Sequence, residues 1–147
     1  MGIKYLIRKI LKTTILLIED SESQADMTRV RLESLGFKVV WCRSAAEAMD
    51  VAEKSNVDCN VVDWVTGETL EFRKKVIRTL TTKAPTIIYT IDLEGLMQDA
   101  PEFAGFAVSK ELEQSKFLSL VEDTVRRGKS GWHFVFKEEP IDEVVID

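Results

Sequence analysis

The segment Asp58-Cys59-Asn60-Val61-Val62-Asp63-Trp64 holds a short, buried-type apolar run that ends in an acid. An earlier run of the same kind, Ile15-Leu16-Leu17-Ile18, ends in two acids, Glu19 and Asp20. The two runs predict neighbouring strands of a parallel sheet with a carboxylate cluster at one edge. Such a cluster suits a hard cation that binds beside a phosphate.

The composition is that of a soluble globular protein with one domain. The chain has 147 residues, of which 45% are hydrophobic and 31% charged, and this length suffices to bury a core. The net charge of −5 argues against binding to nucleic acid, because phosphate backbones attract basic surfaces. Cys42 and Cys59 fall in or beside apolar runs, which favours buried thiols in a reducing compartment over a disulfide.

The sequence carries no sign of a membrane span or a secretion signal. No stretch reaches the roughly 20 apolar residues that cross a bilayer. Lys12 interrupts the apolar part of the N-terminus, and no small-residue cleavage site follows it. We therefore expect a cytoplasmic protein.

Short apolar runs alternate with helical patterns along the chain. The expected strands are 15–18, 39–41, 59–62, 86–89 and 106–108, and the expected helices are 23–35, one that begins after Ser44, 69–81 and 111–127. In the first helix the apolar positions, which are Met27, Val30, Leu32 and Leu35, follow the helical period only imperfectly. Five strands that alternate with helices predict a parallel sheet covered on both faces.

The segment 93–105 is the weakest of the expected helices. It contains Gly95 and Pro101, and these residues destabilise a helix by about 1 and about 3 kcal/mol. We expect a helix that is short, broken or mobile.

Two extensions flank the predicted domain of residues 13–127. Residues 1–12 are basic and amphipathic, and we expect them to pack on the domain or on a second subunit in preference to a membrane. Residues 128–147 end in acids and include the apolar run Trp132–Phe136, which could pair with a sheet edge in the same chain or in a dimer. His133 is interpreted as part of this run and not as a ligand.

Polar residues converge on the carboxyl edge of the predicted sheet, where ligands bind in parallel α/β folds. Glu19 and Asp20 end the first strand, Asp63 the third, Thr90 the fourth and Lys110 the fifth. No single one of them would carry a functional prediction, but their convergence predicts a site.

The chain resembles the receiver domain of bacterial two-component response regulators, and among these the chemotaxis regulators, from about residue 13 to residue 127. The resemblance lies in ILLIEDSES, LGFKVVWCRSAAEAMDVAEKSNVDCNVVDW, APTIIYT and the lysine of FAVSKEL. It implies an α/β fold with a doubly wound, five-stranded parallel sheet, flavodoxin-like, in the strand order 2-1-3-4-5.

The resemblance also implies roles for the converging residues. Asp63 would accept a phosphoryl group from the phosphohistidine of a sensor histidine kinase or a phosphotransfer protein. Lys110 would bring a positive charge to the acyl phosphate, and the Thr90 hydroxyl would turn to a phosphoryl oxygen. The partner that receives the signal would be a protein and not nucleic acid.

A magnesium ion is implied in the same way. Glu19 and Asp20 would hold Mg²⁺ together with Asp63 and the backbone carbonyl of Val65. Mg²⁺ prefers few carboxylates, several waters and phosphate oxygens, and it would neutralise charge during an in-line transfer.

Each of these residues also has a plainer interpretation. Asp20 could cap the following helix, and Asp63 could be a loop carboxylate. Thr90 could be a hydroxyl that merely ends a strand, and Lys110 a solvated lysine. Asp92 could add negative charge near the phosphoryl site or cap a short helix.

The chain departs from the family pattern in the residues that read the site. Ile91 replaces a small residue and is expected to crowd the site, while Ala107 replaces the switching aromatic. Phe106 is expected to point to the other face of its strand. Glu111 replaces a proline, and the loop 65–67 is short and lacks a Met-Pro pair. We expect slow phosphorylation or a different readout.

Three functions remain open at this point. The first is a single-domain response regulator, since only a short tail follows Arg127, and it is a phosphoacceptor and not an enzyme in the usual sense. The second is a degenerate receiver that binds partners independently of phosphorylation. The third is a Mg²⁺-dependent phosphohydrolase, which would need an acid where Val65 stands.

Overall fold

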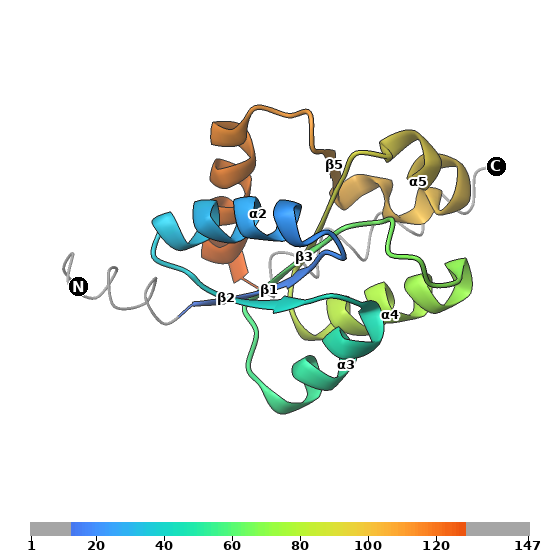
Figure 1. Ribbon diagram of the computed structural model, residues 1–147, viewed down its shortest axis with the longest axis horizontal. Helices are drawn as coiled ribbons and strands as arrows, with labels where there is room; N and C mark the ends of the chain where they lie inside the picture. The colour runs from blue at the N-terminus through green and yellow to red at the C-terminus, as the bar shows by residue number, and fades with distance from the viewer. Residues whose placement is uncertain (1–12, 129–147) are drawn as a thin grey trace.

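The computed structural model describes residues 13–128 of the chain, and within them five strands form one sheet (Figure 1). The strands are β1 (Thr14–Ile18), β2 (Lys38–Cys42), β3 (Cys59–Val62), β4 (Thr86–Thr90) and β5 (Ala107–Ser109). The helices are α2 (Glu22–Ser34), α3 (Ala45–Lys54), α4 (Leu70–Lys83), α5 (Leu93–Asp99), the 3-10 helix η1 (Pro101–Phe106) and a final helix over residues 114–128.

The sheet is parallel throughout and has the order β2-β1-β3-β4-β5. The register pairs Ile15 with Cys59 and Ile18 with Val62, so β1 and β3 end side by side. The chain first builds outward from β1 to β2 and then crosses to β3, which makes the β1–β3 junction the point where the winding reverses. The predicted doubly wound fold is confirmed.

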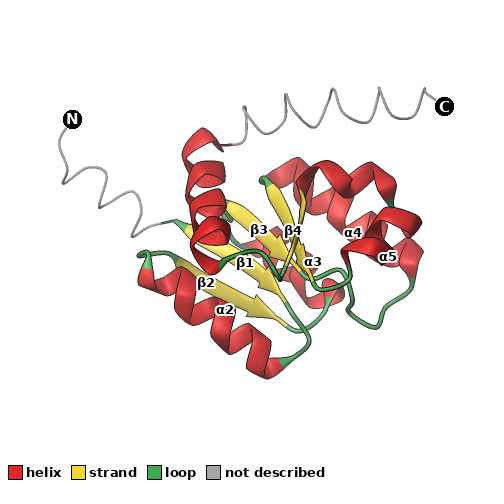
Figure 2. Ribbon diagram, turned by 90° about the horizontal axis from the view of Figure 1, so that it is seen from above, coloured by secondary structure: helices red, strands yellow, loops and turns green. Residues whose placement is uncertain are grey.

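Helices cover both faces of the sheet (Figure 2). Ile15 and Leu17 of β1 join a core cluster with α2 and the final helix. Leu16 and Ile18 join a second cluster with α3, α4, α5 and η1. Successive strand residues point to opposite faces, so each strand contributes to both cores and reads as a nearly continuous apolar run.

The two cysteines lie one on each side of the sheet. Cys42 belongs to the cluster under α3 and α4, and Cys59 to the cluster under α2 and the final helix. Both are fully buried and free. Burial raises the pKa of both thiols to about 12. The prediction of buried thiols is confirmed.

Serine side chains cap the first turn of two of the helices. The Ser21 hydroxyl accepts from the backbone N–H of Gln24 (3.4 Å), and the Ser44 hydroxyl accepts from that of Glu47 (3.1 Å). The Glu47 carboxylate in turn accepts from the backbone N–H of Arg43 (2.7 Å). These bonds satisfy donors that the first turn of a helix leaves without partners.

Two of the four apolar residues of the expected first helix lie outside the face that α2 buries. Met27 and Val30 are 53% and 60% exposed, while Ala25, Thr28 and Leu32 are buried. The imperfect apolar period therefore arises because two apolar residues lie on the outer side of the helix.

The segment between β4 and β5 is short and broken, as predicted. The helix α5 ends at Asp99, and Pro101 begins the 3-10 helix η1. Phe106 ends η1, so β5 starts one residue later than expected, at Ala107. The final helix starts at residue 114 and not at 111. The N–H groups of Lys116 and Phe117 both donate to the Glu113 carbonyl at this start.

The two flanking extensions lie outside the described residues. The predictions for residues 1–12, for Trp132–Phe136 and for His133 therefore stay predictions. Within residues 13–128, none of the helices combines the length and the apolar character that a membrane crossing requires.

Candidate functional site

Three acids meet at the carboxyl ends of β1 and β3. Glu19 and Asp20 follow β1, Asp63 follows β3, and the backbone N–H of Asp63 donates to the Ile18 carbonyl (2.9 Å). One carboxylate oxygen from each acid lies within 4.8 Å of the others. Glu19 and Asp63 are buried, whereas Asp20 is exposed. Carboxylates this close repel one another, and one exposed member leaves room for waters, so this donor set fits a magnesium ion.

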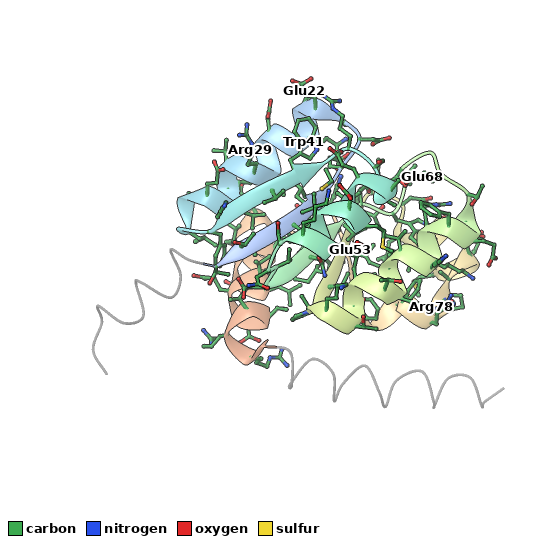
Figure 3. The ribbon with its side chains drawn as sticks, turned by 90° about the horizontal axis from the view of Figure 1, so that it is seen from below. Glu22, Arg29, Trp41, Glu53, Glu68 and Arg78 are labelled. Carbon is green, nitrogen blue, oxygen red and sulfur yellow. The ribbon has the colours of Figure 1, made fainter. Side chains whose placement is uncertain are left out.

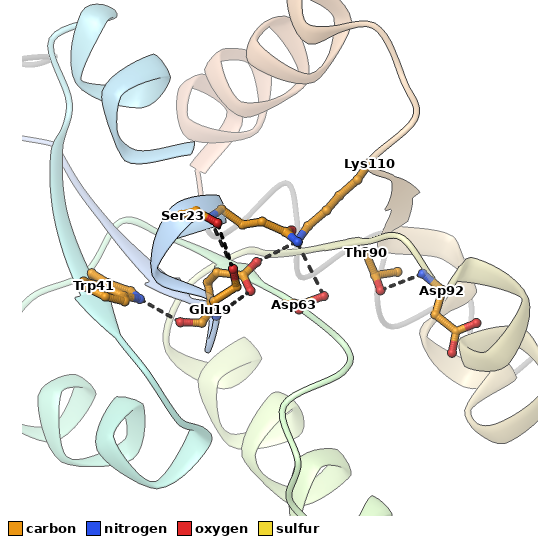
Figure 4. Close-up of polar contacts among 9 residues, drawn as sticks. Glu19, Ser23, Trp41, Asp63, Thr90, Asp92 and Lys110 are labelled. Carbon is orange, nitrogen blue, oxygen red and sulfur yellow. Dashed lines mark hydrogen bonds and ion pairs between the residues drawn. The ribbon is translucent and has the colours of Figure 1, made fainter. Parts of the chain in front are cut away.

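Lys110 reaches into the same site from the end of β5 (Figure 4). Its Nζ lies 2.6 Å from Oε1 of Glu19, 2.6 Å from Oε1 of Gln24 and 3.8 Å from Oδ1 of Asp63. Its side chain is only 11% exposed, so the alternative of a solvated lysine is wrong. The ammonium group donates hydrogen bonds to Glu19 and Gln24 and forms only a longer ion pair with Asp63.

Glu19 is held by contacts on both its side chain and its backbone. Its Oε2 accepts from the backbone N–H of Ser21 (3.1 Å), and its carbonyl accepts from the indole N–H of Trp41 (2.7 Å). The N-cap of α2 is Ser21, so the alternative that Asp20 caps this helix is wrong. Asp20 thus keeps its carboxylate at the solvent side of the cluster.

The pKa of the Asp63 carboxylate is strongly shifted by its surroundings. Burial raises its pKa to about 6, and the negative charge of Glu19 acts in the same direction. The ammonium of Lys110, the backbone N–H of Val65 and the Thr90 hydroxyl lower it in part. Its Oδ1 is buried and has no hydrogen-bond partner. A carboxylate oxygen in this state is available to a cation or to a group that forms a bond with it.

Thr90 and Asp92 form a polar link at the end of β4. Thr90 is fully buried, and its hydroxyl accepts from the backbone N–H of Asp92 (3.1 Å). The Asp92 carboxylate accepts from the backbone N–H of Gly95 (3.1 Å) and so caps α5. A Cβ at Gly95 would lie 2.2 Å from Oδ2 of Asp92, so a larger residue there would force the Asp92 side chain to shift. The capping interpretation of Asp92 is confirmed.

The Arg73 side chain, from α4, binds the loop that follows Asp63. Arg73 donates from Nη1 to the Trp64 carbonyl (2.6 Å) and from Nε to the Glu68 carbonyl (3.2 Å). Its guanidinium carbon lies 4.5 Å from the centroid of the Trp64 ring. Trp64 is 2% exposed, so the residue beside Asp63 is part of the core.

Glu68 anchors the far end of this loop to α3. Its carboxylate accepts from the first two N–H groups of that helix, at 3.0 and 3.3 Å, and from the Thr66 hydroxyl at 3.1 Å. Figure 3 shows Glu68 beside the start of α3. A carboxylate in this place is favoured because the N-terminus of a helix carries a partial positive charge.

Ile91 lies on the surface and not in the buried part of the site. It is 67% exposed and lines a groove of about 190 Å³ together with Met27, Tyr89 and Lys110. Gln24 and Lys110 also line this groove and the three acids do not, so Ile91 adjoins the site only on its lysine side.

The aromatic residues near β5 are committed to packing. Phe106 packs on Phe103 (ring centroids 5.7 Å apart), and Phe103 packs edge-on to Trp64 (6.4 Å). On the other face of the sheet Tyr89 stacks on Phe117, with centroids 3.8 Å apart. Ala107 is half-buried and packs against the same core cluster as Phe106. The expectation that Phe106 points to the other face of a strand is therefore wrong, because Phe106 ends η1 and does not belong to β5.

Sequence reasoning missed Gln24, Glu68 and Arg73. All three are polar residues of helices or loops, and no motif surrounds them. Gln24 stands three residues after the cap Ser21, a position that sequence rules assign to capping. Its contact with Lys110 depends on how α2 packs against the end of β5, which no local pattern reveals.

No protein-family model and no curated protein sequence matches the chain significantly. Solved structures do match. The signal receiver domain of an HD domain-containing protein from Pseudomonas fluorescens Pf-5 is 16% identical with a TM-score of 0.67, and the match covers 79% of this chain and 96% of that one. The receiver domain of the Francisella response regulator 1452 is 18% identical with a TM-score of 0.65, covering 79% and 98%.

A response regulator from Thermotoga maritima is similar to the same degree, with 19% identity, a TM-score of 0.64, and coverage of 78% of this chain and 98% of that one. At these sequence identities the three matches show the fold of the chain and not its activity. The described part of the chain has the fold of response-regulator receiver domains.

Proposed function

We propose that the protein is a response-regulator receiver that accepts a phosphoryl group on Asp63. The observation that carries the proposal is the state of Asp63: a buried carboxylate whose Oδ1 accepts no hydrogen bond, forms an ion pair with the Lys110 ammonium at 3.8 Å and lies beside two further acids. The receiver-domain fold of its structural neighbours supports the same conclusion.

The proposed reaction is an in-line transfer from a phosphohistidine of a kinase or phosphotransfer protein. The P–N bond breaks as a P–O bond forms to Asp63, and the electron pair of the P–N bond stays on the imidazole, which takes up a proton. Lys110 then moves its charge from Glu19 toward the new phosphoryl group. The Thr90 hydroxyl donates to a phosphoryl oxygen. Positioning and charge supply most of the catalysis in such transfers.

Glu19, Asp20 and Asp63 would hold a Mg²⁺ ion, with the Val65 carbonyl as a further ligand. When bound, the ion supplies positive charge that offsets the repulsion between the carboxylates and the incoming phosphoryl group. The protein itself contributes the fixed carboxylates and the Lys110 ammonium.

The proposal can be tested on the purified protein with Mg²⁺ and either a small phosphodonor or beryllofluoride. We expect a gain in intact mass equal to one phosphoryl group, and quenching of Trp64 fluorescence as Mg²⁺ binds. Mass is the stronger measurement, because Trp41 and Trp132 dilute the fluorescence signal. The Asp63→Asn variant should lose the response, and Asp58→Asn, at the opposite end of β3, should keep it. No mass gain in the unmodified protein would sink the proposal.

A second candidate is an interaction module that works without phosphorylation. The exposed Ile91 and Met27, in the groove beside Lys110, favour it, as does the absence of the usual aromatic at Ala107. It predicts that a captured partner binds the Asp63→Asn variant as tightly as the unmodified protein. A phosphohydrolase is disfavoured, since the exposed apolar Val65 stands where its second acid would be.

We place the protein in the cytoplasm as a signalling protein and not a turnover enzyme. Its partners would be a sensor kinase or phosphotransfer protein and a downstream protein, with a homodimer as a further option. A pull-down with the beryllofluoride-loaded protein, compared with Asp63→Asn, would identify them.

A further inference from the structure

Arg73 makes all three of its described contacts to the short loop that follows Asp63. Its guanidinium donates to the carbonyls of Trp64 (2.6 Å) and Glu68 (3.2 Å) and stacks on the Trp64 ring at 4.5 Å. The planar fork of arginine suits such paired contacts, which lysine cannot reproduce. A single side chain of α4 therefore holds both the first and the last peptide of the loop.

The contact with the Trp64 carbonyl fixes the orientation of one peptide plane. The carbonyl of Trp64 and the N–H of Val65 belong to the same planar peptide, which is trans. In a trans peptide these two groups point in opposite directions. Because the carbonyl is held toward Arg73 on α4, the Val65 N–H is turned away from α4 and toward Asp63. The influence of this N–H on the Asp63 carboxylate agrees with that direction.

The other contacts of the loop also restrict the peptide that Arg73 binds. Glu68 is bound through its carboxylate to the start of α3 and to Thr66, while its carbonyl accepts from Arg73. Trp64 is wedged between Arg73 and the edge of Phe103. The loop is thus attached to α3, to α4 and to the core, and the peptide next to Asp63 has little freedom to rotate.

We propose that Arg73 is a positioning residue, which orients the Trp64–Val65 peptide so that the Val65 N–H is presented to an anion on Asp63. The inference rests on the proposed function, because the anion that it would serve is the phosphoryl group. Arg73 would not touch the phosphoryl group, and it acts only through the backbone.

The test uses two variants and a matched control on the same helix. Arg73→Met removes the charge and the fork, and Arg73→Lys keeps the charge but loses the paired donors. Arg78→Met is the control, since Arg78 also lies over an aromatic ring, that of Phe103 at 5.8 Å, and pairs with Glu102 at 3.1 Å, away from Asp63. Figure 3 shows Arg78 on α4, apart from Glu68.

The first measurement is the amide resonance of Val65 and its hydrogen exchange in the protein without ligands. Both should change in Arg73→Met and stay unchanged in Arg78→Met, with Arg73→Lys in between. The second is the affinity for beryllofluoride in the presence of Mg²⁺. It should fall about tenfold in Arg73→Met, the size expected for one hydrogen bond to a charged group, and by less than twofold in Arg78→Met.

An unchanged Val65 amide in Arg73→Met would overturn the inference, and so would equal losses of affinity in Arg73→Met and Arg78→Met. If the unmodified protein binds no beryllofluoride, the proposed function fails, while the Val65 amide still decides whether Arg73 orients the peptide. If Arg73→Met does not fold, Arg73→Lys provides both measurements.

Discussion

The edge around Asp63 and the segment α5–η1 are held in place in different ways. Around Asp63 the charged side chains share partners, and the one side chain of Lys110 contacts Glu19, Gln24 and Asp63. In α5–η1 the polar contacts include the Asp92 cap and the ion pairs of Glu102, and the inner side is held by apolar side chains, of which Leu96, Phe103 and Phe106 are buried. Polar contacts depend on direction and distance, whereas apolar packing depends on volume. A site held by polar contacts can therefore keep its geometry while a segment held by apolar packing changes.

Trp64 is the place where the two regions meet. It follows Asp63 directly, and its ring packs edge-on to Phe103 of η1. Five substitutions test how far the regions are independent, and they are taken in order of expected size.

Truncation of the aromatic core under η1 should have the largest effect. Phe103→Ala is expected to lower the free energy of unfolding by about 3–5 kcal/mol, since Phe103 is 1% exposed. Urea unfolding measures the loss, and Leu32→Ala on the opposite face serves as control. If the regions are independent, the affinity for Mg²⁺ changes less than about threefold at a temperature where the variant is folded, a limit of under 1 kcal/mol. A larger drop would show that they form one unit.

Neutralisation of Asp63 should give a pH-dependent gain in stability. Its folded-state pKa of about 6 lies above the ordinary value of 3.8, so the folded state binds more protons between these values. Stability therefore falls as pH rises through this window. We expect Asp63→Asn to gain up to about 3 kcal/mol relative to the unmodified protein between pH 3.5 and pH 7.5.

Urea unfolding with a chelator at several pH values measures this gain, with Asp58→Asn as control. A difference between the Asp63→Asn variant and the unmodified protein that stays constant with pH would show that the carboxylate is not held in a disfavoured charged state.

Loss of the cap of α5 should have a smaller effect. Asp92→Ala is expected to cost about 1 kcal/mol, the usual value for an N-cap. Gly95→Ala should also destabilise, because its Cβ would collide with the Asp92 carboxylate. Asp92→Asn keeps an oxygen for the cap and is the control. Thermal unfolding measures all three, and a stable Asp92→Ala variant would mean that α5 is held by Leu96 alone.

Substitution in the groove beside Lys110 should barely affect stability. Ile91→Ala is expected to stay within about 0.5 kcal/mol, as exposed residues usually do. If Ile91 narrows access to Asp63, phosphorylation by a small phosphodonor becomes faster in the variant. An unchanged rate, followed by intact mass, would assign any slowness to another residue.

The sequence predicted what depends on strand order and missed what depends on helix packing. The strand 59–62 was placed at its observed ends, because an apolar run bounded by acids leaves little choice. The exposure of Met27 and Val30 is not apparent from the sequence, since hydrophobicity alone does not say which side of α2 meets the sheet. Phe106 ended a 3-10 helix in place of beginning a strand, because Pro101 starts that turn.

The candidate site was predicted as a set of residues but not as a set of contacts. Convergence of Glu19, Asp63 and Lys110 follows from the carboxyl ends of parallel strands. That Lys110 lies nearer to Glu19 than to Asp63 does not follow, and neither does the Arg73 contact. Both depend on side chains that cross between elements far apart in the sequence.

The protein has one buried thiol on each side of the sheet, and each thiol can report when the helices that cover it detach. Cys42 is sealed by one helical layer and Cys59 by the other, and neither is reactive while it is covered, since both have a pKa of about 12. An alkylating reagent added to the native protein would therefore mark each cysteine only when its own layer detaches. Peptide masses taken over time would tell which layer of the receiver fold opens first.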